Sequence, residues 1–340
     1  MRMRTLGGTG IKVSPYCLGA MMFGAWGNPD HDESIRIIHR ALDAGINFID
    51  TADAYGESEV VVGKSLKGRR DSVVLATKVG RPIGDDPSHQ GASRRWIITA
   101  VENSLRRLQT DFIDLYQIHR PDPGTDIEET LSALSDLIRS GKVRVIGASQ
   151  TPASDIIEAQ WAAERRGRER FVCEQPPYSI LVRGVEAEVL PACRRYGMGV
   201  IPWSPLAGGW LSGRYRKDAD LPASTRAERI PQRFDMSLPG NQAKLDATEK
   251  LAQLAEQAGL SLIHLALAFV INHPAVTSAI IGPRTTAHLE SQLGAADVVL
   301  TRDILDKIDE IVPPGTTLNP PDRGYEPPAL VNPALRRRRR

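Results

Sequence analysis

The sequence predicts an α/β protein whose architecture is a closed (β/α)8 TIM barrel. Along most of the 340 residues, short apolar segments alternate with amphipathic segments of helical periodicity, the pattern of parallel βαβ units. Eight such apolar segments occur, which favours a closed barrel over an open, doubly wound sheet. No G-x-G-x-x-G segment follows a strand and opens a helix, so the usual sign of the open dinucleotide-binding sheet is missing.

The eight strands are expected at residues 13–18, 46–50, 73–77, 112–118, 143–148, 171–175, 200–203 and 279–281. Between them, apolar residues recur at helical spacing, as in the run from Ile97 to Leu108. Gly45 and Gly141 stand where two of these helices end. One further helix is expected around residues 185–196.

Three segments fall outside the repeat. Residues 3–10 predict an N-terminal hairpin, and residues 206–240 form a long loop after the seventh strand, where Trp210 and Phe234 are further candidates for pocket walls. We expect a single barrel domain over residues 1–312. Residues 313–340 form a Pro- and Gly-rich C-terminal tail that either covers the active-site face or stays disordered.

Charge and cysteine content narrow the class of protein. The formal charge of +2 includes five terminal arginines, Arg336 to Arg340; without them 38 basic residues face 41 acidic ones. This balance argues against a nucleic-acid binder. No apolar run approaches the roughly 20 residues of a membrane span, and no signal-peptide core is present. Three scattered cysteines without a CxxC pair predict a cytoplasmic protein without a disulfide framework.

Ionisable residues stand at the ends of three consecutive predicted strands. Asp50 and Lys78 end two of them, His119 follows the third, and Tyr55 lies five residues after Asp50. In a barrel, the carboxyl ends of the strands share the active-site face, so these four side chains are expected to meet there.

This set of side chains is suited to protonating a carbonyl oxygen. A tyrosine holds its proton up to about pH 10, and a lysine ammonium beside it is expected to lower that pKa. Asp50 would keep Lys78 charged, Tyr55 would act as general acid, and His119 would orient the carbonyl. Because none of these groups supplies electrons, reduction needs a hydride donor and hence a nicotinamide cofactor. Two other roles remain: Lys78 as an aldolase-type Schiff base, and Asp50 with His119 as a metal site that lacks a third ligand at suggestive spacing.

The sequence resembles the aldo-keto reductase superfamily over roughly residues 4–311. The resemblance is carried by residues 47–52 with Tyr55-Gly56, Ala76-Thr77-Lys78, residues 116–122, and Trp203-Ser204-Pro205-Leu206. It implies a (β/α)8 barrel that binds NADPH extended across its mouth. It also implies that Asp50, Tyr55, Lys78 and His119 form the catalytic tetrad of the family, with Tyr55 as the acid.

The same resemblance assigns cofactor contacts, with NADP preferred over NAD. At the nicotinamide end it assigns Ser149, Gln150, Gln175 and the stacking Trp203; glutamine stands at 150 where the family more often has asparagine. Along the pyrophosphate it assigns Ser204, Pro205, Leu206, Gly208 and Arg214. At the adenosine end it assigns Gly282, Arg284, which would meet the 2′-phosphate, His288 and Gln292.

The function expected from the resemblance is NADPH-dependent reduction of an aldehyde or ketone to an alcohol. Phe23 and Trp26 are expected as walls of the substrate pocket. The alternatives are a nucleotide-binding, redox-sensing regulatory subunit with little turnover, such as those that accompany membrane channels, and a keto-sugar reductase of a biosynthetic pathway. Aliphatic aldehydes, quinone-like ketones and keto-sugars all stay open as substrates, and so does the oligomeric state.

Overall fold

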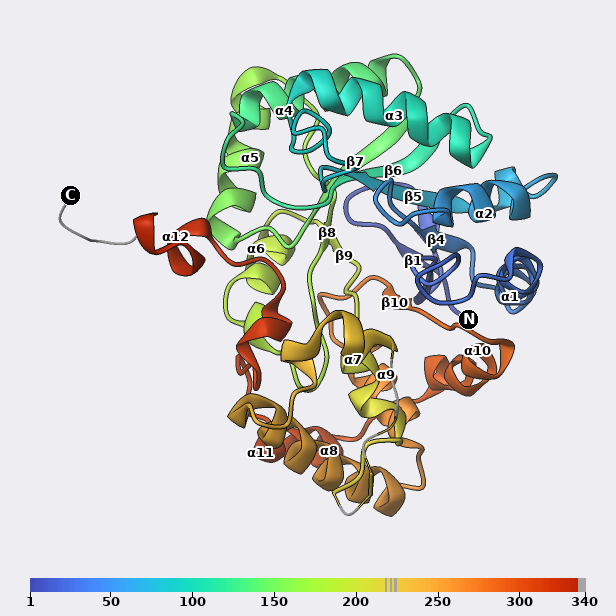
Figure 1. Ribbon diagram of the computed structural model, residues 1–340, viewed down its shortest axis with the longest axis vertical. Coiled ribbons are helices and arrows are strands. Elements are labelled where there is room, and N and C mark those ends of the chain that lie inside the picture. The colour runs from blue at the N-terminus through green and yellow to red at the C-terminus, as the bar shows by residue number, and fades with distance from the viewer. Residues whose placement is uncertain (218, 221, 223–224, 336–340) are drawn as a thin grey trace.

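A parallel sheet lies at the centre of the computed structural model, which describes residues 1–217, 219–220, 222 and 225–335 (Figure 1). Among these residues the sheet has eight strands in the order β10-β3-β4-β5-β6-β7-β8-β9. They are β3 (Tyr16–Gly19), β4 (Phe48–Asp50), β5 (Val74–Val79), β6 (Ile113–Ile118), β7 (Val143–Ser149), β8 (Cys173–Gln175), β9 (Gly199–Val200) and β10 (Ala279–Ile281). Backbone hydrogen bonds from Thr277 N to Val200 O (2.8 Å) and from Ile280 N to Pro202 O (2.9 Å) join its two ends. The predicted (β/α)8 barrel is confirmed.

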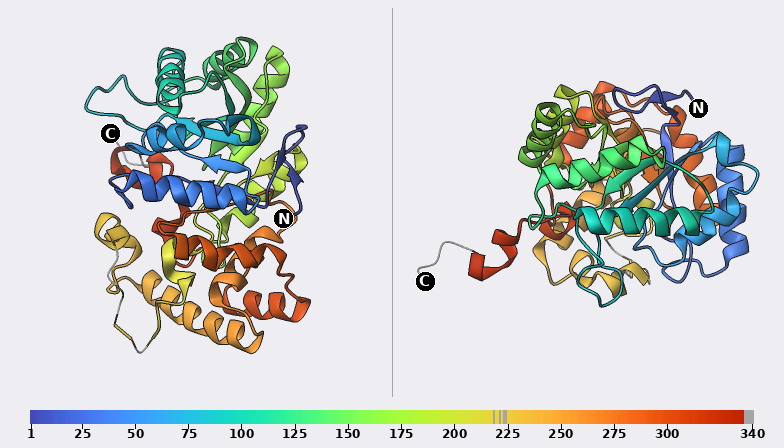
Figure 2. Two further views of the ribbon diagram at one scale, coloured as in Figure 1. Left: turned by 90° about the vertical axis from the view of Figure 1, so that its right-hand side faces the viewer. Right: turned by 90° about the horizontal axis from the view of Figure 1, so that it is seen from above.

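Helices surround the strands (Figures 1 and 2). Their amphipathic sequences bury one face against the sheet, and side-chain caps mark several starts; Asp30, for example, accepts from the backbone of Asp32 and Glu33. The longer helices are α1 (His31–Asp43), α2 (Ser58–Ser65), α3 (Arg94–Leu108), α4 (Ile127–Arg139), α5 (Ala153–Arg166), α6 (Val189–Arg195), α8 (Pro239–Gln257), α9 (Leu262–Ile271), α10 (Thr286–Leu293) and α11 (Arg302–Ile311). The helix expected around residues 185–196 is shorter than predicted, since a 3-10 turn occupies Gly184–Glu186.

Two predicted strands are corrected by the structure, both at prolines. The strand expected at residues 13–18 is divided: Val13 belongs to the hairpin, and β3 begins at Tyr16. The strand expected at 200–203 ends at Val200. Pro15 and Pro202 lack the N–H that a continuing ladder requires, although the carbonyls of both accept hydrogen bonds from β10.

The N-terminal hairpin packs against the barrel interior. Its strands are β1 (Arg4–Thr5) and β2 (Lys12–Val13), so the hairpin extends a few residues beyond the predicted 3–10. Leu6 in its turn is fully buried among inward-facing residues of the strands. Gly7 has φ +54°, and a Cβ there would lie 2.7 Å from Gly199 N, which leaves room only for glycine.

The long loop after β9 and the C-terminal tail pack on each other. The loop contains a 3-10 turn (Ala207–Ser212), α7 (Thr225–Arg229) and a second turn (Pro231–Arg233). Trp210 stacks on Tyr215 and Phe234, so these aromatic rings mainly fill the loop. Of the two predicted wall residues, Phe234 borders a small pocket of about 20 Å³ beside Trp203. The fully buried Lys244 of α8 donates to Asp322 of the tail at 2.8 Å.

The tail covers part of the barrel as far as about residue 327. Leu318 N donates to Leu181 O, and Asn319 bonds to Asn241. Beyond this stretch, α12 (Pro328–Val331) stands off the barrel (Figure 2). The five terminal arginines, to which no role is assigned, lie outside the described residues.

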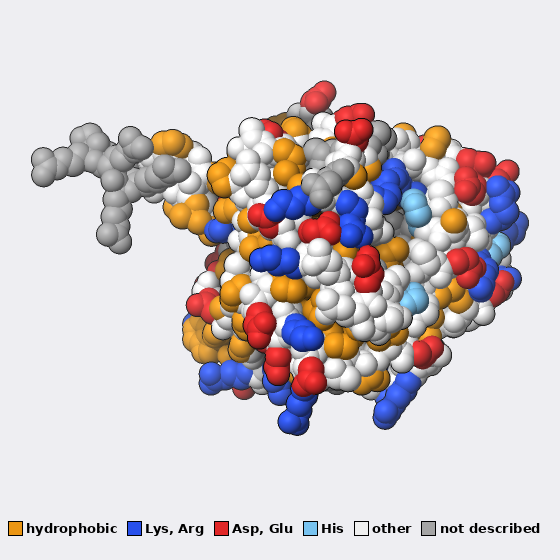
Figure 3. Space-filling view, turned by 90° about the horizontal axis from the view of Figure 1, so that it is seen from below, with side chains coloured by type: hydrophobic (Ala, Val, Ile, Leu, Met, Phe, Trp, Pro, Cys, Tyr) orange, Lys and Arg blue, Asp and Glu red, His pale blue; other side chains and the backbone are white. Residues whose placement is uncertain are grey.

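The outer surface mixes charges of both signs. Figure 3 shows Lys and Arg interspersed with Asp and Glu on the face seen from below. Within the described ranges, no single helix has the length and apolar composition to cross a membrane. The pair α8 and α9 meets such a test only when the two are joined, and they are bent by 95°.

Gly7→Ala tests the fit of the hairpin into the barrel. We expect the free energy of unfolding to fall by about 2 kcal/mol, because alanine is strained at positive φ and overpacks the contact. Gly10→Ala is the matched control, since nothing lies within 4 Å of a Cβ at Gly10 and its φ is ordinary. Denaturant unfolding of both variants measures the difference; equal midpoints would contradict the close approach at Gly7.

Candidate active site

The four predicted catalytic side chains meet at the carboxyl ends of β4, β5 and β6. Asp50 is the last residue of β4, Lys78 lies near the end of β5, and His119 directly follows β6. Tyr55 lies in the turn between β4 and α2, where Tyr55 N donates to Ala52 O and Ser58 N to Tyr55 O. Parallel pairing of the three strands, with Asp50 opposite Ala76 and Lys78 opposite Gln117, fixes their relative positions.

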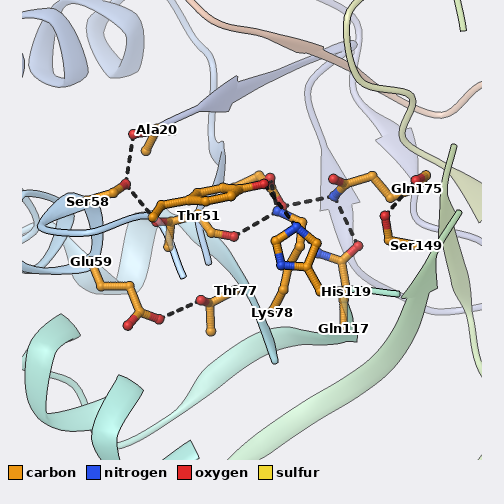
Figure 4. Close-up of polar contacts among 12 residues, drawn as sticks. Ala20, Thr51, Ser58, Glu59, Thr77, Lys78, Gln117, His119, Ser149 and Gln175 are labelled. Carbon is orange, nitrogen blue, oxygen red and sulfur yellow. Dashed lines mark hydrogen bonds and ion pairs between the residues drawn. The ribbon is translucent and has the colours of Figure 1, made fainter. Parts of the chain in front are cut away.

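Lys78 and Asp50 form a buried ion pair. Lys78 Nζ donates to Asp50 Oδ1 at 2.5 Å and to Thr51 O at 2.8 Å. The second Asp50 oxygen accepts from Gln117 Nε2 (3.2 Å) and Gln175 Nε2 (3.0 Å) (Figure 4). Burial alone would lower the pKa of Lys78, but the carboxylate of Asp50, with a contribution from Tyr55, raises it above its ordinary value. The amine is therefore a charged group held in place.

Tyr55 and His119 form the reactive edge of the site. Tyr55 Oη lies 3.3 Å from His119 Nε2, and the Lys78 amine lies 5.0 Å from the centre of the Tyr55 ring. Burial raises the pKa of Tyr55 above 10, although Lys78 acts in the opposite direction. The expected lowering of the Tyr55 pKa is thus outweighed by desolvation.

His119 is neutral at physiological pH. Burial, followed by the charges of Lys78, Arg81 and Arg120, holds its pKa well below 6.5. Its Nδ1 is buried and has no hydrogen-bond partner among the residues that the structure describes.

A cavity of about 740 Å³ opens on this edge, and Asp50, Tyr55 and His119 line it. That volume suits a small-molecule or cofactor site. The predicted cofactor residues that line the same cavity are Ser149, Gln150, Gln175, Trp203, Ser204, Pro205, Leu206, Gly208, Arg214, Gly282, Arg284, His288 and Gln292.

At the predicted nicotinamide end, several polar groups are available. Ser149 Oγ donates to Gln175 O at 2.8 Å, which leaves its oxygen able to accept. Gln150 Oε1 and Trp203 Nε1 are buried and have no hydrogen-bond partner in the described part of the chain. Gln175 differs from expectation in that its amide donates to Asp50 and to Gln117.

The backbone at two of the predicted cofactor segments is strained. Of the described non-glycine residues, four have positive φ, and three of them are Gln150 (60°), Ser204 (56°) and Ala207 (50°). Gly208 and Gly209 follow with φ of 72° and 111°. Strain of this kind typically persists at ligand-binding segments, where it brings backbone groups close to a ligand.

The predicted adenosine end is basic. Thr285 caps α10, Arg284 immediately precedes it, and the charges of Arg284 and Arg214 add to burial in lowering the pKa of His288. The N-terminus of a helix beside arginines favours phosphate. Asn28 Nδ2 donates to Arg284 O at 3.1 Å and fixes this turn, while Gln292 Oε1 is buried without a partner. These features fit a phosphorylated dinucleotide.

The predicted substrate walls take different positions. Trp26 packs beside the Tyr55 ring, with centroids 6.0 Å apart, and the Arg229 guanidinium lies 4.3 Å from the centre of the Trp26 ring. Contrary to the prediction, Trp26 is not among the described residues that line the cavity. Phe23 is fully buried in the core, and Met21 and Met22 line the cavity from that loop instead. Met21, Met22, Phe23 and Trp26 lie in one short segment, and no pattern in the sequence distinguishes the side chains that line the cavity from those that pack in the core.

Two groups stand out among the cavity residues to which sequence reasoning gave no role. Arg81 and Arg120 line it beside the tetrad, and Pro321, Gly324 and Glu326 bring the tail into its wall. The arginines follow predicted strand ends, a signal that was available. The tail carries no periodicity that could have placed it.

Residues 15–313 match the model of the aldo/keto reductase family. The chain is 40% identical to the uncharacterized oxidoreductase YrpG of Bacillus subtilis, over 91% of this chain and 95% of that protein. It is 36% identical to the aldo-keto reductase YhdN of the same organism (86% and 87% covered), and 35% to a probable voltage-gated potassium channel subunit beta of Arabidopsis thaliana (92% and 97%). With the tetrad geometry and a match over most of its length, this chain belongs to the aldo/keto reductase family.

Proposed function

We propose that the protein is an NADPH-dependent carbonyl reductase that converts an aldehyde or ketone to an alcohol in the cytoplasm. The observation that carries the proposal is the Tyr55–His119 pair above the buried Lys78–Asp50 ion pair, at the wall of a cavity whose other end is basic. The family and the oxidoreductase relatives support the reaction class.

The residues present fit NADPH. Its nicotinamide would be held by Ser149, Gln150 and Trp203, and its phosphates by the loop from Ser204 to Arg214 and by Arg284. When bound, the cofactor supplies the hydride that the side chains lack. Among the described residues, the side-chain oxygens of Gln150 and Gln292 are buried without a hydrogen-bond partner, and Gln150 has a positive φ; both observations support this placement.

Tyr55 supplies the proton. With its raised pKa it is fully protonated near neutrality, and its hydroxyl faces the cavity beside His119. In the tautomer with the proton on Nε2, His119 donates to a carbonyl oxygen placed next to the Tyr55 hydroxyl and orients it. As the proton leaves, the Lys78 ammonium stabilises the phenolate, and Asp50 keeps that ammonium charged.

The aldolase role for Lys78 is disfavoured by its contacts. A Schiff-base lysine must become neutral to attack, whereas Lys78 is paired with Asp50 and donates to Thr51 O. A regulatory role is the second candidate, because relatives of similar identity carry the name of potassium channel subunits. Nucleotide binding with no turnover on any aldehyde would favour it.

Tyr55→Phe removes the proton donor. We expect kcat to fall by about 100-fold or more, because general acids contribute at least that much, while NADPH binding stays unchanged. NADPH oxidation with a panel of aldehydes measures the rate, and cofactor fluorescence measures binding. Tyr196→Phe, at the end of α6, is the control. Equal rates in the wild type and in Tyr55→Phe would show that another residue is the general acid.

The pH profile tests the two pKa directions. Tyr55 has a pKa raised above 10, so it keeps its proton up to about pH 10. His119 has a pKa held well below 6.5, so it is neutral at pH 6.5 and above. At saturating NADPH we therefore expect kcat/KM to be flat between about pH 6.5 and 10 and to fall only above that range. An apparent pKa near 7 would show that another group controls the reaction.

Arg284→Gln tests the preference for NADP. We expect the Kd for NADPH to rise by about tenfold or more, the usual effect of losing a charge-assisted bond to phosphate, and the Kd for NADH to change little. Arg302→Gln, an exposed arginine at the start of α11, is the control. If the Kd values for NADPH and NADH rose by a similar factor, Arg284 would not be the residue that recognises the 2′-phosphate.

A further inference from the structure

Two arginines stand at the cavity wall beside the reactive edge. Arg120 directly follows His119 at the end of β6, and Arg81 lies three residues after Lys78 at the end of β5; both are partly buried and line the cavity. Their charges act on His119, and that of Arg81 also acts on Tyr55. They therefore lie close to the point where the carbonyl would bind.

Within the described part of the chain, neither guanidinium has an ion pair or a hydrogen bond. The pKa of Arg120 is lowered by burial and then by the charges of Arg81 and Arg233, so cations surround it. Among the described residues, the acidic side chains that line the cavity are Asp50 and Glu326 of the tail, and the carboxylate of Asp50 is already paired with Lys78. Neighbouring, partly desolvated cations cost free energy unless an anion joins them.

The phosphates of the cofactor would not be the anion that joins Arg81 and Arg120. In the closed sheet, β5 and β6 stand three or four strands from β9 and β10. The loop from Ser204 to Arg214 and the turn at Arg284, which would hold the phosphates, follow β9 and β10. Arg81 and Arg120 thus follow the strands that also carry Lys78 and His119, on the side of the barrel away from β9 and β10.

We propose that the substrate carries an anionic group, a carboxylate or a phosphate, a few bonds from its carbonyl, and that Arg81 and Arg120 bind this group. The proposal rests on the reductase function above and names its substrate class. Guanidinium groups bind carboxylate and phosphate through paired, charge-assisted hydrogen bonds. Such a contact would also fix the carbonyl against Tyr55 and His119.

The test uses aldehydes that differ in charge and little else. Para-formylbenzoate, its methyl ester and para-formylphenyl phosphate are compared as substrates of the full chain at saturating NADPH. We expect kcat/KM of at least one anionic aldehyde to exceed that of the neutral ester by about tenfold or more. The anion with the larger advantage identifies the preferred group.

Arg81→Gln and Arg120→Gln locate the effect. Each variant is expected to lose most of this advantage through a higher KM, while kcat/KM for the ester stays within about threefold and so reports an intact tetrad. Arg106→Gln, exposed on α3, is the matched control and should keep the full advantage.

Two results would overturn the proposal. The first is that the wild type reduces the ester as efficiently as both anionic aldehydes. The second is that both variants keep the preference for the anionic aldehyde but bind NADPH at least about tenfold more weakly, which would show that the arginines bind the cofactor. The reductase function fails separately, if the wild type neither binds NADPH nor reduces any of the three aldehydes.

Discussion

The buried ion pair between Lys78 and Asp50 is the interaction on which the site depends. Removing an ammonium from water costs several kcal/mol, and only close partners offset that cost. Here the partners come from β4, β6 and β8: Asp50 with the Thr51 carbonyl behind it, then Gln117 and Gln175 on the second carboxylate oxygen. The pair therefore exists only when these strands are in register in a closed barrel. Folding and chemistry are fixed by the same contacts.

The mouth of the barrel is divided by function along the strand order. The tetrad comes from β4 to β6 and their loops, while the predicted cofactor segments follow β7 to β10. The first group is held by side-chain hydrogen bonds and burial. The second depends more on backbone conformation, since Gln150, Ser204 and Ala207 all have positive φ. One cavity thus joins a wall held by side-chain hydrogen bonds, where we propose the proton donor, to a wall shaped by backbone conformation, where we propose the cofactor.

Local sequence pattern was sufficient to predict the barrel and the meeting of Asp50, Tyr55, Lys78 and His119 at its mouth, because strand ends and helix periodicity are local signals. It failed where a single residue overrides a pattern, as Pro15 and Pro202 do for β3 and β9. It also failed where long-range packing decides. Phe23 and Met22 are neighbours in one loop, yet only Met22 lines the cavity. The pKa of Tyr55 shows the same limit, since its direction depends on burial that no spacing reveals.

The tail forms a wall of the cavity from outside the repeating units. Pro321 and Glu326 line it, and Gly324, with φ +89°, lies against the side chain of Gln150. The match to the family model ends at residue 313, so this wall is built from a segment that the shared architecture does not include. Insertions or substitutions there leave strand register and the tetrad untouched. Changes in this segment can therefore alter which molecules the cavity admits without moving the four side chains at the ends of β4, β5 and β6.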